Sequence, residues 1–242
     1  MTALAVARPL LRPRLSDGVV SDLVREIISG RLPPGSTLPP EPELVATYGI
    51  SKVVVRESIL LLQSLGLVIV QQGKRTVVSD EGEWVVLSPI AQEAFRAEGR
   101  GQELVAQLHE ARLIVEPSAA AFSAARATPE RIADLMALAD RLDEIARGSG
   151  DLGDFLRTDR AFHDVIARAG KNVAIRAMMR DLHRFMSFNW EESKVKQSEL
   201  PLLAAQHRRI ADAIARHDTE AAREAMLEHI AWASRIETER AT

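Results

Sequence analysis

The chain has 242 residues, of which 46% are hydrophobic and 27% are charged, so its composition is that of an ordinary folded protein with one large or two small domains. It contains no cysteine, which excludes disulfide scaffolds, thiol nucleophiles, iron–sulfur clusters and cysteine-ligated zinc. A transition-metal site would have to use carboxylates and some of the six histidines. The net charge of -3 divides into +2 for residues 1–80 and -5 for the remainder, so the front half is basic and the rear half acidic.

No segment has the character of a membrane span, because polar residues and Gly66 interrupt the longest apolar stretch, 59–70. Residues 1–14 carry three arginines without an apolar signal-peptide region, and we expect them to be flexible. These features predict a cytoplasmic protein that does not contact membranes.

The first 80 residues predict three short helices followed by a hairpin. Apolar positions recur at helical spacing, and Gly30, Gly49 and Gly66 provide helix ends. Two β-type runs then flank a Gly-Lys-Arg turn. We place helices at 16–29, 41–48 and 51–65 and strands at 67–71 and 76–79. This is the plan of a winged helix-turn-helix, so residues 1–80 are expected to form a DNA-binding domain.

The rest of the chain predicts an all-helical antiparallel bundle, which makes the fold class mostly α. Residues 81–100 are interpreted as a linker with a short helix at 89–98, and residues 101–242 as the helical domain. Pro117 is expected to kink or break the first long helix. We place the helices at 102–125, 129–147, 152–169, 172–194, 199–216 and 219–238. Phe155, Phe162 and Phe185 are assigned to the core.

The helix from Ser51 to Leu65 is the candidate for DNA recognition. Lys52 and Arg56 are four residues apart and lie opposite the apolar stripe, so either could reach a guanine edge while Ser51 and the helix N-terminus hold a phosphate. Lys74 and Arg75 stand at the hairpin tip, where they could touch the minor groove or backbone. The spacing alone is equally compatible with a solvated basic face.

The motifs Gly30 to Pro39, Tyr48-Gly49-Ile50-Ser51, Val55-Arg56-Glu57 and Leu65-Gly66-Leu67 resemble the N-terminal domain of GntR-family transcription regulators. The resemblance implies a homodimer that binds double-stranded operator DNA, with this helix in the major groove and the hairpin at the minor groove. The implied contact positions are Ser51, Lys52, Val53, Val54, Arg56, Gln72 and Gly73. Lys52 stands where the family usually has arginine, and Val53 and Val54 where threonine is frequent, so readout there would be apolar, for instance of thymine methyl groups.

In the acidic half, Asp159 and His163 are one helical turn apart, and His207 and His229 lie on two later helices. Together they would suit a divalent ion with an open position for a ligand, but spacing does not show that they converge. Each histidine could instead be a separate core or surface residue.

The run Glu110 to Pro117, Asp159-x-x-Phe162-His163, His207 with the residues that follow it, and His229 resemble the FCD effector-binding domain of the FadR-type branch of the GntR family. The resemblance implies that the aspartate and three histidines bind a divalent metal that helps to hold a carboxylate effector. We expect zinc, with nickel or manganese as alternatives.

Arg112 has two interpretations. It lies one turn before Glu116, so the two could form a simple ion pair on the helix surface. The resemblance instead implies that Arg112 lines the effector cavity and binds a carboxylate. Asn189 is assigned as a second effector contact and His183 as a further polar neighbour, while His109 receives no role.

The sequence therefore predicts a ligand-responsive transcription regulator, a repressor, whose effector is a small carboxylate such as a sugar acid or hydroxy acid. The alternative is a metal-dependent hydrolase or lyase on a helical bundle, against which the chain has no Glu-x-x-His motif, Gly-rich nucleotide loop or Gly-x-Ser-x-Gly. A structural interaction module with a vestigial metal site is a third possibility.

Overall fold

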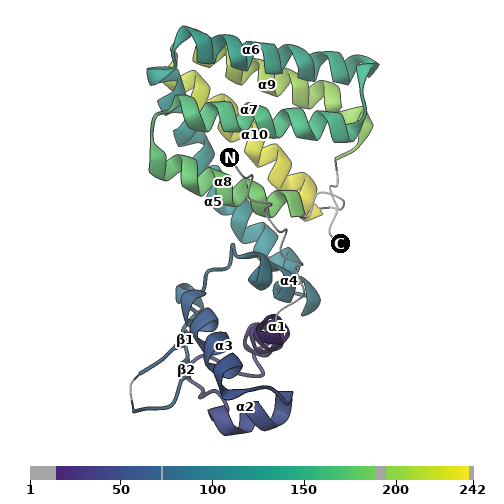
Figure 1. Cartoon of the computed structure of the whole chain (residues 1–242). Helices are drawn as coiled ribbons and strands as arrows, with labels where there is room; N and C mark the ends of the chain where they lie inside the picture. The colour runs from purple at the N-terminus through teal and green to yellow at the C-terminus, as the bar shows by residue number, and fades with distance from the viewer. Residues whose placement is uncertain (1–14, 72, 189–194, 240–242) are drawn as a thin grey trace, which may run out of the picture. The chain divides into compact units, whose positions relative to one another are not determined.

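The computed structural model describes residues 15–71, 73–188 and 195–239 (Figure 1). The chain divides into two compact units, Met1–Gly101 and Gln102–Thr242, which are described separately. Among the described residues, none of the helices combines the length and the apolar character needed to cross a bilayer.

The first unit contains the three predicted helices, α1 (Leu15–Ile28), α2 (Glu41–Tyr48) and α3 (Lys52–Ser64). Both α1 and α2 pack against α3. The predicted apolar stripe of α3 is buried, at Val55, Ser58, Ile59 and Leu62. The Ser51 hydroxyl accepts a hydrogen bond from the backbone N–H of Val54 at 3.3 Å, which confirms Ser51 as the N-cap. Burial of this stripe leaves the opposite face of α3 exposed.

The predicted hairpin is present but its ladder is short. Strands β1 (Val68–Ile69) and β2 (Val77–Val78) are antiparallel, with Val68 opposite Val78. Gly66, just before β1, has φ +70°, and a Cβ there would lie 1.9 Å from the carbonyl oxygen of Glu83. Only glycine fits this turn, because both the backbone conformation and the close approach exclude a side chain.

The residues interpreted as a linker lie within the first unit. A 3₁₀ turn, η1 (Glu81–Glu83), is followed by α4 (Pro89–Ala97), which is capped by Ser88 and contacts α1. Apolar positions one turn apart, Ala91, Ala94 and Phe95, are buried. The expected short helix is therefore present, and its buried face adds to the core of the first unit.

The second unit is a helical bundle. Its elements are α5 (Gly101–Arg126), α6 (Pro129–Glu144), the π-helical turn η2 (Ile145–Ser149), α7 (Leu152–Ala169), α8 (Val173–Phe188), the 3₁₀ turn η4 (Gln197–Glu199), α9 (Leu200–Ala215) and α10 (Thr219–Glu239). In Figure 1 the teal α6 runs beside α9, and α6 also packs on α7, α7 on α8 and α9 on α10. The core is built largely of alanine and aliphatic residues together with Phe155 and Phe162, as predicted. The side chain of Phe185 lies outside the described residues.

Pro117 was expected to kink or break helix α5, and the structure shows that it does not break it, since the helix continues from Gly101 to Arg126. Proline removes one backbone donor, but the bonds before and after it remain, and Pro117 is itself buried against the bundle. As a result, α5 carries residues on both sides of Pro117 on one continuous helix.

Candidate functional site

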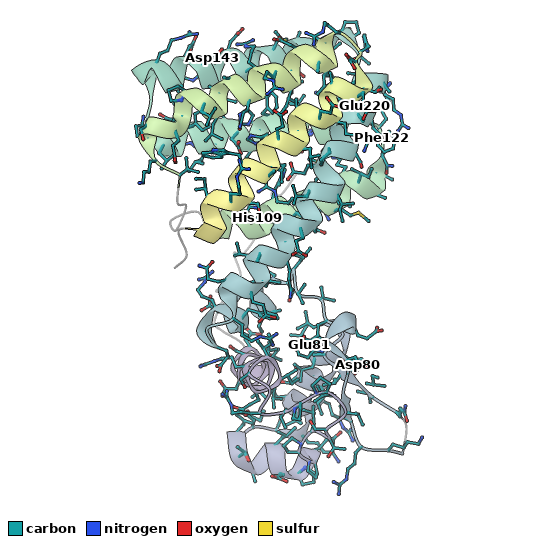
Figure 2. The ribbon with its side chains drawn as sticks, turned by 180° about the vertical axis from the view of Figure 1, so that it is seen from behind. Asp80, Glu81, His109, Phe122, Asp143 and Glu220 are labelled. Carbon is teal, nitrogen blue, oxygen red and sulfur yellow. The ribbon has the colours of Figure 1, made fainter. Side chains whose placement is uncertain are left out.

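Packing of three helices brings the predicted metal-binding residues together. Asp159 and His163 project from α7, His207 from α9 and His229 from α10. Each of the four offers one nitrogen or oxygen atom, and these atoms all lie within 4.8 Å of one another. Figure 2 shows the second unit with its side chains, which fill the space between these helices. Phe162 is fully buried, and its ring lies edge-on to the rings of His207 and His163, at centroid distances of 4.9 Å and 6.0 Å.

The closest approach in the cluster is between Asp159 Oδ1 and His207 Nε2, at 2.9 Å, and His163 Nε2 is 3.8 Å from the same oxygen. The three imidazoles are all buried, with ring centroids of His207 and His229 4.4 Å apart and those of His163 and His229 5.4 Å apart. These distances show that the four side chains surround one small volume.

Hydrogen bonds fix which ring nitrogen faces the centre. His207 donates its Nδ1–H to the carbonyl oxygen of Leu203 at 2.8 Å, and His229 donates from Nδ1 to Gln206 Oε1 at 3.0 Å. A neutral imidazole carries one proton, so Nε2 of each ring then presents a lone pair. The Nε2 of His207 has no aligned hydrogen-bond partner among the described residues, although Asp159 is near. A lone pair facing a carboxylate oxygen at 2.9 Å is an arrangement that a shared cation would stabilise.

The donor set fits a divalent metal ion. Two ligands that each lie about 2.1 Å from an ion are about 3.0 Å apart at a right angle and about 3.4 Å apart at a tetrahedral angle. The observed separations of 2.9 and 3.8 Å bracket these values. Three imidazole nitrogens and one carboxylate suit zinc, nickel or manganese and leave room for a further ligand.

The charge states in the cluster follow from burial and proximity. Burial would raise the pKa of Asp159, but the imidazoles of His207, His163 and His229 outweigh it and lower the pKa. Burial, reinforced by the neighbouring His207 and His163, holds the pKa of His229 well below its usual value. Burial also lowers the pKa of His163. The lowered pKa values favour the ionised form of Asp159 and the neutral forms of His163 and His229, and these are the forms that bind metals.

A second buried group adjoins the cluster through His163. Glu116 on α5 has no exposed surface, and its carboxylate lies 2.6 Å from His163 Nδ1, 3.1 Å from His183 Nε2 and 2.5 Å from Arg112 Nε. Burial would raise the pKa of Glu116, but Arg112, His183 and His163 outweigh it and keep the pKa well below its usual range. Glu116 is thus an anion that links Arg112 to a predicted metal ligand.

Sequence reasoning named Glu116 only as a possible surface partner of Arg112. The ion pair is present, but it is buried, since Arg112 is only 8% exposed and the pair faces the histidines. The contact is made through Nε of Arg112. The signal for Glu116 was the placement of His109, Arg112 and Glu116 three and four residues apart on one helix. Asn189, the other predicted effector contact, lies outside the described residues.

The predicted DNA contacts of the first unit cluster at the start of α3 and in the hairpin. Lys52 and Arg56 are more than half exposed, as is Val53, and Ser51, Gly73, Lys74 and Arg75 are also exposed while Val54 is partly buried. A groove of about 420 Å³ lies between α3 and the hairpin, with Arg56, Lys74 and Arg75 among its lining residues. Gln72 lies outside the described residues.

Glu41, at the start of α2, was not predicted to take part. Its carboxylate lies 3.2 Å from Arg56 Nε and 3.6 Å from Lys52 Nζ, so it partly neutralises both cations in the free protein. A DNA phosphate that approached either side chain would compete with Glu41.

An exposed cationic recognition helix with a wing, followed along the chain by a bundle with a buried Asp/His cluster, defines a DNA-binding regulator that carries a sensing domain. The gntR family of bacterial regulatory proteins matches residues 15–78, and the FCD domain matches residues 107–231. The chain belongs to the GntR family of bacterial transcription regulators and carries an FCD domain, as the sequence motifs predicted.

Relatives with described roles are regulators as well. The chain is 30% identical to the transcriptional repressor NanR of Cronobacter sakazakii over 92% of this chain and 85% of NanR. It is 25% identical to the galactonate operon transcriptional repressor of Escherichia coli over 91% of this chain and 95% of that protein. The solved structure of Lar, which controls the expression of the Listeria monocytogenes agr system, shares the fold with a TM-score of 0.58, covering 94% of this chain and 98% of Lar at 18% identity. The protein is accordingly a transcription regulator and not the hydrolase or lyase that was the alternative.

Proposed function

We propose that the protein is a ligand-responsive repressor whose second unit binds a divalent metal ion and a small carboxylate, and whose first unit binds operator DNA. Asp159, His163, His207 and His229 would hold the ion, with zinc as the first candidate and nickel or manganese as alternatives. The observation that carries this proposal is the convergence of these four side chains, with two buried imidazoles whose Nε2 atoms lack an aligned partner among the described residues.

The ion would supply a positive centre to which a carboxylate group can bind. Arg112 would meet the same carboxylate with its terminal nitrogens, since guanidinium pairs with carboxylate through two parallel hydrogen bonds. The name of the galactonate repressor supports a sugar acid as the effector class, and a hydroxy acid has the same recognition chemistry. Asn189 remains a proposed second contact.

On the DNA side, a homodimer would place α3 in the major groove of double-stranded operator DNA and the hairpin tip at the minor groove. Ser51, Lys52, Val53, Val54, Arg56, Gln72, Gly73, Lys74 and Arg75 are the proposed contacts. Effector binding would lower the operator affinity, and linkage requires that operator DNA lower the effector affinity by the same factor. Such a regulator acts in the cytoplasm, where the DNA lies.

The test is a gel shift on the promoter fragment beside the protein's own gene, combined with metal analysis. We expect specific binding, about one metal ion per chain, and release of the DNA by a sugar acid or hydroxy acid. Absence of specific binding to that fragment would refute the repressor role, and unchanged metal content in His207→Ala would refute the metal site.

A further inference from the structure

His109 is a buried histidine to which neither the metal cluster nor the DNA-binding surface gives a role. It lies on α5 (Figure 2) and is 1% exposed. Neither of its ring nitrogens has a hydrogen-bond partner within the part of the chain that the structure describes. Buried polar atoms in native proteins nearly always have a partner, and exceptions occur at sites that bind a ligand or water.

The position of His109 on α5 relates it to the effector site. His109, Arg112 and Glu116 are three and four residues apart, and all three are buried, so they form one inward-facing row along the helix. The rise of an α-helix puts His109 about 4.5 Å along the axis from Arg112. The row leads from Glu116, which contacts His163 of the metal cluster, through Arg112 to His109. A ligand whose carboxylate binds Arg112 would extend its carbon chain toward one end of this row.

The protonation state of His109 limits what it can bind. Burial, together with the nearby positive charge of Arg112, lowers the pKa of His109 to about 4, so the ring is neutral at physiological pH. A neutral imidazole presents one N–H donor and one nitrogen acceptor, and it does not attract a second carboxylate by charge. A hydroxyl group, which can both donate and accept, is its complement.

We propose that His109 binds a hydroxyl group of the effector and thereby makes the regulator respond to hydroxylated carboxylates in preference to plain carboxylates of the same length. The proposal deepens the proposed function and rests on it, since Arg112 and the metal ion are what place the ligand's carboxylate. A binding site that hydrogen-bonds a ligand hydroxyl discriminates strongly against the analogue that lacks it, because the polar group of the site is then left unpaired. A purely apolar pocket does not separate two such ligands strongly.

The test uses two ligand pairs that differ only in hydroxyl groups, galactonate with hexanoate and lactate with propanoate. Affinities are measured by calorimetry on the zinc-loaded full chain for the wild type, His109→Leu and His109→Gln. Leucine fills a similar volume without polar atoms, and glutamine retains one donor and one acceptor. Glu110→Gln, on the exposed side of the same helix turn, is the matched control.

We expect the wild type to bind at least one hydroxy acid more tightly than its plain partner, and His109→Leu to weaken that binding by roughly 5- to 100-fold without affecting the plain acid. His109→Gln should recover part of the loss, and Glu110→Gln should bind as the wild type does. Zinc content should be unchanged in every variant. His109→Leu should also raise the melting temperature of the ligand-free protein, because it removes buried atoms that lack a partner.

Equal binding of hydroxylated and plain acids by the wild type would overturn the proposal for His109 and leave the proposed carboxylate response in place. Unchanged hydroxy-acid affinity in His109→Leu would also overturn the proposal for His109, and would show that His109 serves only in packing. If neither hydroxy acid nor plain acid binds to the wild type, the carboxylate response itself is wrong and the proposal for His109 falls with it.

Discussion

Replacing Glu116 by glutamine tests how the buried carboxylate supports both Arg112 and His163. The substitution preserves the shape of the side chain but removes the negative charge that Arg112 Nε contacts at 2.5 Å and His163 Nδ1 at 2.6 Å. Because Glu116 is fully buried and the Arg112 side chain is 10% exposed, water cannot replace the lost charge. Removing one partner of a buried ion pair costs about 3–5 kcal/mol.

Glutamine can still accept one hydrogen bond, so we expect the free energy of unfolding to fall by about 2–4 kcal/mol. For a unit of this size, the melting temperature should fall by on the order of 5–15 °C. Zinc affinity should fall by about 10- to 100-fold, since an outer carboxylate orients the histidine and makes it more basic. Thermal unfolding monitored by circular dichroism and a competition titration with a chromogenic zinc chelator measure the two effects.

Glu110→Gln removes a carboxylate from the exposed face of α5 and should change neither quantity. If Glu116→Gln keeps the stability and zinc affinity of the wild type while Glu110→Gln behaves as expected, Glu116 supports neither Arg112 nor His163.

Three further perturbations have defined outcomes. Gly66→Ala should destabilise the first unit by several kcal/mol, because its Cβ would lie 1.9 Å from the Glu83 carbonyl oxygen at a φ of +70°; a melting temperature equal to that of the wild type would contradict this. Glu41→Gln should raise affinity for the promoter fragment several-fold in fluorescence anisotropy, since it releases Arg56 from a 3.2 Å ion pair; weaker binding would mean that Glu41 positions the cation for DNA. The folded-state pKa of His109, about 4, lies below its unfolded value of 6.5, so the unfolded chain binds more protons between these pH values. The contribution of His109 to the free energy of unfolding should therefore be complete above pH 6.5 and fall by up to about 3 kcal/mol toward pH 4. In denaturant titrations, His109→Leu should remove this part of the pH dependence. Identical pH profiles for the two proteins would show that His109 keeps its ordinary pKa.

Much of the first unit could be predicted because its signals are local. The stripe of α3 follows from helical spacing, and the capping role of Ser51 follows from the hydroxyl before the first turn. The place of α4 could not be predicted in the same way. Its apolar residues Ala91, Ala94 and Phe95 indicate a helix with a buried face, but only the folded structure shows that α1 covers it.

The candidate metal site could also be predicted only in part, because some of its geometry follows from local spacing and the rest from the packing of helices. The placement of Asp159 and His163 on one face of α7 follows from their spacing of four residues. Their meeting with His207 and His229 depends on how three helices pack, which no single-helix pattern contains. Glu116 was missed as a site residue because a glutamate four residues after an arginine is a common surface pair, and its burial becomes visible only in the bundle.

We propose that the buried cluster of the second unit controls DNA binding by the first. The most direct measurement is a titration of galactonate, and in parallel of lactate, into the zinc-loaded complex of the protein with its promoter fragment, followed by fluorescence anisotropy for the wild type and His207→Ala. We expect at least one of these acids to release the DNA from the wild type, whereas His207→Ala should retain DNA binding and not respond to either acid. Equal release from both proteins, or no release from either, would contradict the claim.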